Sequence, residues 1–367
     1  MNPADLPRTV ARAVCCAVEE GELPAGVEVP GRVVVERTRP GGVGEYATPV
    51  AFQVAGSAGR RPAEVAGVLA RRLGAVPGIE RVDVTGAGFL NFVLAPLSPA
   101  RIVALAAEAH SYPKADPYPD PDLDLDPNPR QCPCAPTRRR ASAFDALDAA
   151  DSPDSPDAPG GLRERVVRAA VGRILRVWGC VGEEHPAPVA PVAKRDGDVL
   201  ARYGSDAARW AMLVVPARET PEFSDVLLVQ GEASEFFRVR YAHARAHALV
   251  ANAARLGFRP LPSDPADTSE APETPDTPDT TTAPLLRALV DHALVLEAAA
   301  HHRAPERLAR HLVEVADALL DFQYRVLPHG DEKPSAAHRS RLALAEAAGT
   351  VLAGGLALLG IDAPTRL

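Results

Sequence analysis

The stretch "FFRVRYAHARAH", residues 236–247, decides the fold of the second half of the chain. It contains no Gly or Pro, and its apolar residues recur at helical spacing. Tyr241 and Arg245 are four residues apart and therefore share one helix face, which Arg238 extends by a turn. The stretch thus predicts a helix with a ridge of arginine and aromatic side chains, although the chain's formal net charge is −8.

Further helical patterns surround this stretch on both sides. Residues 162–179 and 205–215 precede it, and three long Ala- and Leu-rich patterns follow at 284–302, 304–327 and 335–360. Their length and spacing predict an all-α antiparallel bundle.

The first 110 residues mix helix and strand patterns. Strands are predicted at 31–38, 79–86 and 88–96, and helices at 6–21, 48–59, 61–74 and 98–110. This order predicts an α+β domain with helices on a small antiparallel sheet, closed by the helix at 98–110.

Two Pro- and Asp-rich tracts predict disordered linkers. Residues 113–161 contain eleven prolines, and residues 260–283 contain six prolines and six acidic residues. The tracts carry net charges of −5 and −6, which leaves about +3 for the rest of the chain. The predicted organisation is a domain at 1–112, a linker at 113–161, a segment at 162–200, and a helical domain at 201–367 with a disordered insert at 260–283.

Cysteine spacing and hydropathy indicate a soluble, reduced protein. The five cysteines form no C-x-x-C pair, so free thiols are favoured over a zinc site and no metal is expected. No signal pattern and no apolar run of about 18 residues is present. We expect a cytoplasmic location and no membrane association.

Several motifs together resemble the class I arginine–tRNA ligase family. "GEYATPVAFQVAGSAGRRPAEVAGVLARRL" and "GIERVDVTGAGFLNFVL", residues 44–73 and 78–94, resemble its N-terminal tRNA-binding domain. "YGSDAARWAML" (203–213), "VRYAHAR" (239–245) and "LLGIDAPTRL" (358–367) resemble its Asp-Ala-Leu-Arg (DALR) anticodon-binding domain. The resemblance implies tRNA as the partner, with an arginine-accepting tRNA as the first candidate.

The middle of the chain departs from this family. "DPNPRQCPCAPTRRR", residues 126–140, begins like the Asn-Pro turn of the catalytic domain but has no His-x-Gly-His. "VAKRDGDVL", residues 192–200, resembles a degenerate form of the family's lysine loop, with Lys194 and Arg195 at its centre. The parallel sheet that should separate these signatures needs more than about 100 residues. We therefore predict no catalytic residues and no cofactor.

The same resemblance assigns two RNA-contacting sites. Phe89 and Asn91 lie on one face of a predicted strand and match the positions that contact a base at the outer corner of the tRNA. The alternative is that Phe89 is a core residue and Asn91 a turn or edge residue.

The second site is the helix that opens this section. Tyr241 and Arg245 match positions that meet the anticodon loop, and Arg238 adds charge beside them. The alternative is a solvated basic face whose His243 packs internally.

Three functions follow from these patterns. The first is a tRNA-binding protein without aminoacylation activity. The second is a protein–protein interaction module derived from a synthetase. The third and most distant is arginine–tRNA ligase activity, as the family name implies.

Overall fold

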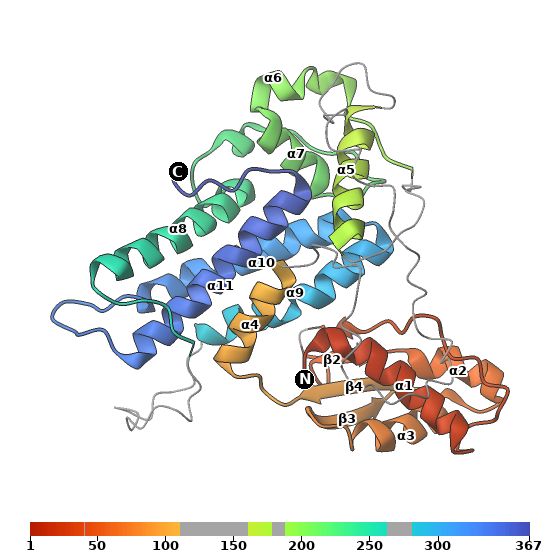
Figure 1. The fold of residues 1–367 in the computed structure, drawn as a ribbon. Helices are drawn as coiled ribbons and strands as arrows, with labels where there is room; N and C mark the ends of the chain where they lie inside the picture. The colour runs from red at the N-terminus through yellow and green to blue at the C-terminus, as the bar shows by residue number, and fades with distance from the viewer. Residues whose placement is uncertain (40, 111–160, 178–187, 263–280) are drawn as a thin grey trace, which may run out of the picture. The chain divides into compact units, whose positions relative to one another are not determined.

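The computed structural model describes residues 1–39, 41–110, 161–177, 188–262 and 281–367 (Figure 1). Residues 113–160 and 263–280 of the predicted linkers lie outside these ranges. The described residues form two compact units, one over Met1–Leu97 and one that includes the helices from residue 98 onward.

The N-terminal unit is a four-stranded antiparallel sheet with three α-helices. Its strands are β1 (Glu36–Arg37), β2 (Tyr46–Thr48), β3 (Ile79–Thr85) and β4 (Phe89–Leu94), in the order β1-β2-β4-β3. The helices are η1 (Pro3–Asp5), α1 (Leu6–Glu19), α2 (Val50–Ala58) and α3 (Pro62–Leu73). The predicted α+β class with an antiparallel sheet is confirmed.

Strand β4 shows how alternation builds this core. Leu90 and Phe92 point to one face and are fully buried, and Leu94 on the same face is 8% exposed. The strand at 31–38 is shorter than predicted, because only Glu36–Arg37 pairs with a neighbour. Strand β2 lies partly in a stretch predicted as helix. It has three residues and ends before Pro49, which is too short for a two-residue period to be detected.

The helical unit contains the bundle that the sequence predicts. Its helices are α4 (Pro99–His110), α5 (Leu162–Val177), α6 (Val199–Tyr203), α7 (Ser205–Leu213), α8 (Glu235–Arg255), α9 (Thr282–His302), α10 (Pro305–Phe322) and α11 (Ala336–Leu359). Short 3₁₀ turns lie at η2 (Lys194–Asp196), η3 (Asp225–Leu228) and η5 (Gln323–Arg325).

Helix α4 corrects one expectation. It was predicted to close the N-terminal domain, but it packs against α9 and α11. Its buried side chains Ile102, Leu105 and Ala106 cover part of the bundle. Sequence proximity to the sheet did not decide its partner, because the apolar face of an amphipathic helix fits either neighbour.

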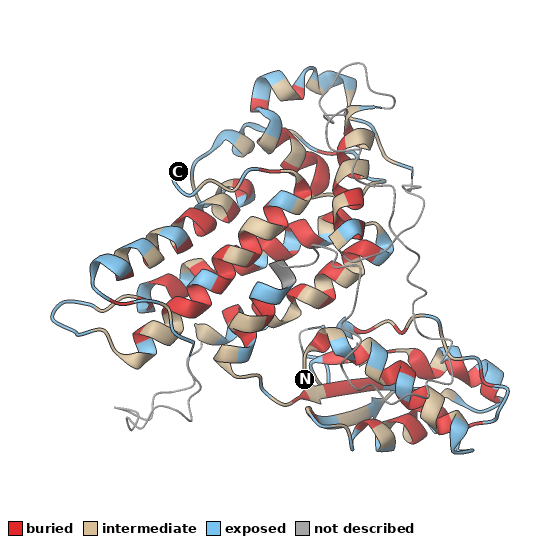
Figure 2. Ribbon diagram, viewed as in Figure 1, coloured by how far each residue is buried: buried red, intermediate tan, exposed pale blue. Residues whose placement is uncertain are grey.

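Helix α11 is the centre of the bundle, with α8, α10 and α4 packed against it, and most of it is buried (Figure 2). It is long and apolar enough to cross a membrane by composition alone, but 67% of its most apolar stretch is buried inside the protein. Such burial is typical of a core helix, so a membrane location is not indicated.

Arg163, at the start of α5, holds the irregular segment beyond α7. Its side chain is 1% exposed, and its guanidinium donates to Met212 O (3.2 Å), Ala190 O (2.8 Å) and Pro216 O (2.9 Å). Further bonds reach the carbonyls of Val215, Ala217 and Glu219. A buried cation thus organises two separate stretches of chain, and no carboxylate of the described residues forms an ion pair with it.

Candidate nucleic-acid interface

An open hollow of about 580 Å³ lies beside the sheet of the N-terminal unit, and Phe89 and Asn91 both line it. The Phe89 side chain is 45% exposed, and its ring lies 4.9 Å from that of Phe52, at an angle of 56°. One edge of the Phe89 ring is therefore supported by the protein, while much of its surface is open to a ligand. The wall of the hollow also includes Thr85, Val43 and residues of the β1 segment.

Asn91 is 5% exposed, and its neighbours fix which way its amide faces. The amide nitrogen donates to Thr85 Oγ1 at 2.7 Å and lies 3.4 and 3.5 Å from the carbonyl oxygens of Asp83 and Phe89. Two carbonyl acceptors on this side require the NH₂ group there. The Oδ1 atom has no hydrogen bond among the described residues and is therefore an available acceptor.

The alternative interpretation of this pair is wrong on geometry. Phe89 is exposed and is not a core residue. Asn91 lies on β4, which pairs with β2 on one side and β3 on the other, so it is in a central strand and neither in a turn nor at an edge. The Asn91 amide nitrogen has a structural partner in Thr85, and only its Oδ1 atom lacks a hydrogen bond among the described residues.

The second surface lies on α8. The Tyr241 side chain is 39% exposed and stacks on Phe237, with ring centroids 5.6 Å apart and an angle of 13° between the planes. Arg245 donates from Nε to Gln323 Oε1 at 2.6 Å. No hydrogen bond among the described residues engages its two terminal nitrogens. Tyr241 and Arg245 therefore form the shared face that their spacing predicts.

Arg238 has polar partners that its spacing did not predict. Its guanidinium forms a two-point ion pair with Asp317, at 2.8 and 3.2 Å, and also donates to Glu232 O at 2.6 Å. The carboxylate neutralises the charge that was predicted to extend the RNA-facing ridge. Asp317 lies 79 residues away on α10, so the spacing within α8 gave no signal of this pair.

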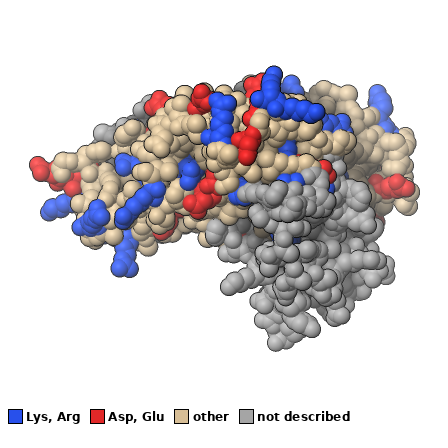
Figure 3. Space-filling view, turned by 90° about the horizontal axis from the view of Figure 1, so that it is seen from above, with Lys and Arg blue, Asp and Glu red and all other residues tan. Residues whose placement is uncertain are grey.

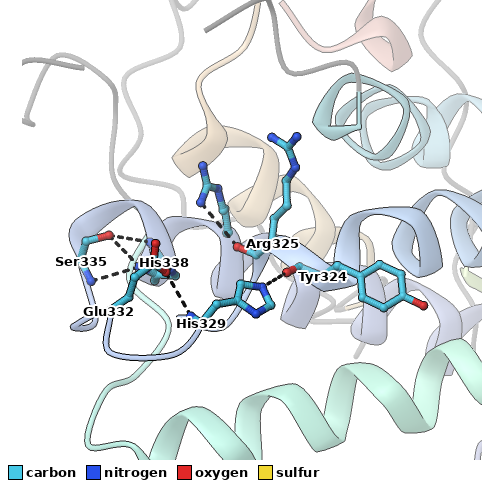
Figure 4. A network of polar contacts seen from close by, with 7 residues as sticks. Tyr324, Arg325, His329, Glu332, Ser335 and His338 are labelled. Atoms are coloured by element: carbon cyan, nitrogen blue, oxygen red, sulfur yellow. Dashed lines mark hydrogen bonds and ion pairs between the residues drawn. The ribbon is translucent and has the colours of Figure 1, made fainter. Parts of the chain in front are cut away.

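Tyr324 was not identified from the sequence. It lies in η5, next to the Gln323 that holds Arg245, and its side chain is 68% exposed. His329 contacts the Tyr324 carbonyl oxygen at 2.5 Å, and the backbone NH of His329 donates to Glu332 at 3.1 Å. Figure 4 shows the Tyr324 ring pointing away from this network. The sequence feature that could have pointed to Tyr324 is an aromatic residue just after the apolar face of α10 ends.

His243 packs internally, as the alternative interpretation of α8 supposed. Its Nδ1 lies 3.0 Å from Pro364 O, which joins α8 to the C-terminal segment, and burial lowers the pKa of its imidazole. This inward face does not compete with the outward face of Tyr241, since the two residues lie on different sides of α8.

The predicted lysine-loop residues, Lys194 and Arg195, lie in η2 and are both exposed. Arg195 is 3.8 Å from Asp196, and neither residue lines a described pocket. Within the described ranges, no group of three potential metal ligands is present.

Charged side chains of both signs are interspersed over the face seen in Figure 3. That face has no continuous basic patch.

Comparison with known proteins identifies both units. Residues 9–94 match the family model described as the arginyl tRNA synthetase N terminal domain, and residues 239–367 match the DALR anticodon binding domain. The first match contains the hollow, and the second contains Tyr241 and Arg245.

Two solved structures are similar to the chain. A putative arginyl-tRNA synthetase from Campylobacter jejuni is 23% identical, with a TM-score of 0.36 over 46% of this chain and 35% of that chain. The arginyl-tRNA synthetase of Thermus thermophilus is 16% identical, with a TM-score of 0.49 over 99% of this chain and 100% of that chain. The chain thus spans about a third of the Campylobacter protein.

The assignment rests on the two domain matches, which occur in the order that the sequence motifs predict. By its N-terminal and DALR anticodon-binding domains, this chain belongs to the arginyl-tRNA synthetase family.

Proposed function

We propose that this protein binds tRNA through both units and does not aminoacylate it. The observation that carries the proposal is the exposure of two separate recognition surfaces, one in each matched domain. Phe89 and Asn91 offer a ring and an amide acceptor in the N-terminal hollow. Tyr241 and Arg245 offer a ring and a guanidinium on α8. Rings that stack and polar groups that reach base edges are how proteins recognise unpaired RNA bases.

An arginine-accepting tRNA is the first candidate partner, since both matched domains are found in arginyl-tRNA synthetase. We also expect the protein to act in the cytoplasm, where tRNA is available.

The absence of catalysis is argued from the sequence. Amino-acid activation requires preorganised positive charge on the ATP phosphates and a site that orients the carboxylate. The chain contains no His-x-Gly-His, and its lysine-loop counterpart, Lys194 and Arg195, is exposed in a short 3₁₀ turn. The expected result is no ATP–pyrophosphate exchange with arginine. Exchange above background from protein purified free of host synthetase would contradict this part of the proposal.

Binding is tested by titrating bulk tRNA at several salt concentrations. Tyr241→Ala should cost about 1–3 kcal/mol, the usual contribution of one base–aromatic stack. Arg245→Ala should weaken binding and reduce the slope of log K against log salt by about one. Arg255→Ala, at the far end of the same helix, is the matched control. Equal affinities for the parent and both test variants would count against an RNA site on α8.

The alternative is that the bundle docks on another protein. Val226, Leu228 and Val229, in and after η3, are exposed apolar side chains that such a partner could cover. Arg245→Glu distinguishes the two functions, because charge reversal should abolish RNA binding but spare a partner that docks on η3.

A further inference from the structure

The short turn η3 and the residue after it expose an apolar patch. The exposed fractions of Val226, Leu228 and Val229 are 46%, 52% and 44%. No other stretch of the described residues exposes three large apolar side chains within four positions. Single exposed apolar side chains are ordinary, whereas adjacent ones mark sites where another surface docks. We call these three residues the η3 patch.

The geometry of the turn brings the three side chains together. Val226 and Val229 are three residues apart, so they lie on one face of a 3₁₀ turn, and the backbone NH of Val229 donates to Val226 O at 3.1 Å. Leu227 is half-buried, and η3 packs against α7. The turn therefore buries part of one leucine against the helical unit and leaves the η3 patch outside.

The chain around the η3 patch is anchored to the helical unit. Pro221 is buried, and the Phe223 ring lies 5.8 Å from the ring of the buried Tyr203 on α6. Arg202, also on α6, donates to Asp225 at 2.8 Å. A surface that is already held in place loses little conformational freedom when a partner docks, so ordering it costs less of the binding free energy.

The residues that flank the η3 patch are acidic. Residues 218–235 contain five acidic residues and one arginine, a net charge of −4, and all five acidic side chains are exposed. These five residues, which we call the acidic flank, are Glu219, Glu222, Asp225, Glu232 and Glu235. Such a surface repels the phosphates of RNA and attracts cations. The occupant of the patch is therefore not tRNA.

We propose that the η3 patch docks a cationic amphipathic segment of another protein. The apolar side chains of that segment cover Val226, Leu228 and Val229, and its Lys or Arg side chains lie against the acidic flank. A second copy of this chain fits less well, because a symmetric dimer through the patch would bring two acidic flanks together. The inference goes beyond the proposed function, since it assigns a surface that Tyr241, Arg245 and the N-terminal hollow do not include.

A short synthetic peptide of leucine and lysine at helical spacing is the probe for the apolar contact. In the full chain, Leu228→Asp should weaken binding of this peptide at least about tenfold, because the apolar face of the peptide loses its main contact. The new carboxylate by itself attracts a cationic peptide, so a loss of affinity reports the apolar contact and not the charge. Leu256→Asp is the matched control, because Leu256 is also 52% exposed, lies at the end of α8 and receives the same charge. Thermal melts and tRNA affinities that match the parent show that the variants are folded.

Glu222→Lys tests the charge of the acidic flank. This change should weaken binding of the same peptide about fivefold and flatten the salt dependence of its binding. Glu346→Lys is the matched control, because Glu346 is exposed on α11 and its replacement changes the net charge by the same amount. A peptide with glutamate in place of lysine should not bind the parent.

Three results would overturn the proposal. One is an affinity of Leu228→Asp for the lysine peptide equal to that of Leu256→Asp. Another is a parent protein with no preference for the lysine peptide over the glutamate peptide. The third is self-association of the parent in analytical ultracentrifugation that Leu228→Asp abolishes, since a second copy would then be the occupant. None of these results concerns tRNA binding, so the proposed function is judged by its own variants.

Discussion

Arg163 shows how much one side chain can organise. A methionine side chain at position 163 would fill a similar space but leave the carbonyls of Met212 and Ala190 without this donor. The carbonyls of Pro216 and Ala217 would keep a backbone NH donor. Each buried carbonyl that loses its partner costs about 1–3 kcal/mol. We therefore expect Arg163→Met to lower the free energy of unfolding by at least about 3 kcal/mol, as measured by urea denaturation. Arg163→Lys keeps the charge but has fewer donors, so its free energy of unfolding should lie between those of the parent and Arg163→Met. Parent-like stability of the Met variant would show that these bonds contribute little.

His243 makes the stability of the helical unit depend on pH. Burial lowers the pKa of His243 in the folded protein, and burial likewise lowers the pKa of His338 in the first turn of α11. In the unfolded chain these two histidines have a pKa of about 6.5, so they bind protons more readily there than in the folded protein. The stability that the neutral histidines provide is complete above about pH 6.5 and is lost as the pH falls below it.

Melting temperatures at pH 7.5 and 5.5 test this expectation. The parent should melt lower at pH 5.5, and His243→Gln should show a smaller difference between the two pH values. A pH difference as large in His243→Gln as in the parent would assign the effect to other groups.

At the scale of elements, Gly349 lets α8 and α11 approach closely. A Cβ atom at position 349 would lie 2.9 Å from Ala246 Cβ, and neither group can rotate away. Gly349→Ala should therefore push α8, the helix that carries Tyr241, away from α11. The expected cost is about 1–3 kcal/mol, even though alanine favours helix more than glycine does.

Gly67→Ala is the control for helix propensity. Gly67 lies in α3, and a Cβ atom there meets nothing within 4 Å. This change should stabilise the N-terminal unit by up to about 1 kcal/mol. Stabilisation by Gly349→Ala as well would mean that the two helices can separate at little cost.

The elements were predictable to the degree that their pattern was long. Helices α8, α9, α10 and α11 run for five turns or more, and their apolar period identifies them from the sequence. Strand β2 has three residues and escaped detection. The partner of α4 was also missed, since an amphipathic pattern indicates that a face is buried but not what covers it.

The site was predictable where it depends on spacing within one element. Alternation along β4 places Phe89 and Asn91 on the face opposite Leu90 and Phe92, and the i, i+4 spacing places Tyr241 and Arg245 on one helix face. The ion pair of Arg238 with Asp317 and the support of Arg245 by Gln323 connect distant parts of the chain. No local pattern contains such contacts, so the structure was needed to find them.

At the scale of the whole molecule, the two surfaces are expected to act together on one tRNA. When two linked sites bind one partner, each raises the effective concentration of the other, and the combined affinity exceeds either alone by about 10²–10⁴-fold. Asn91→Ala should therefore weaken binding of intact tRNA by far more than one hydrogen bond would. It should leave binding of an isolated anticodon stem-loop unchanged.

Tyr241→Ala provides the comparison, since it should weaken binding of both RNAs. Affinities of the two variants for the two RNAs give four measurements from one titration design. If Asn91→Ala reduces the affinity for the stem-loop as much as for intact tRNA, the two surfaces do not recognise separate parts of one molecule.

The buried hydrogen bonds of Arg163 have a practical consequence for such titrations. Its cation is buried against neutral carbonyl groups, and dissolved ions screen buried interactions much less than exposed ones. Contacts between surface arginines and phosphate are weakened by the same ions. A salt wash should therefore release bound RNA while the helical unit keeps its fold, so that one immobilised sample can be loaded, stripped and loaded again.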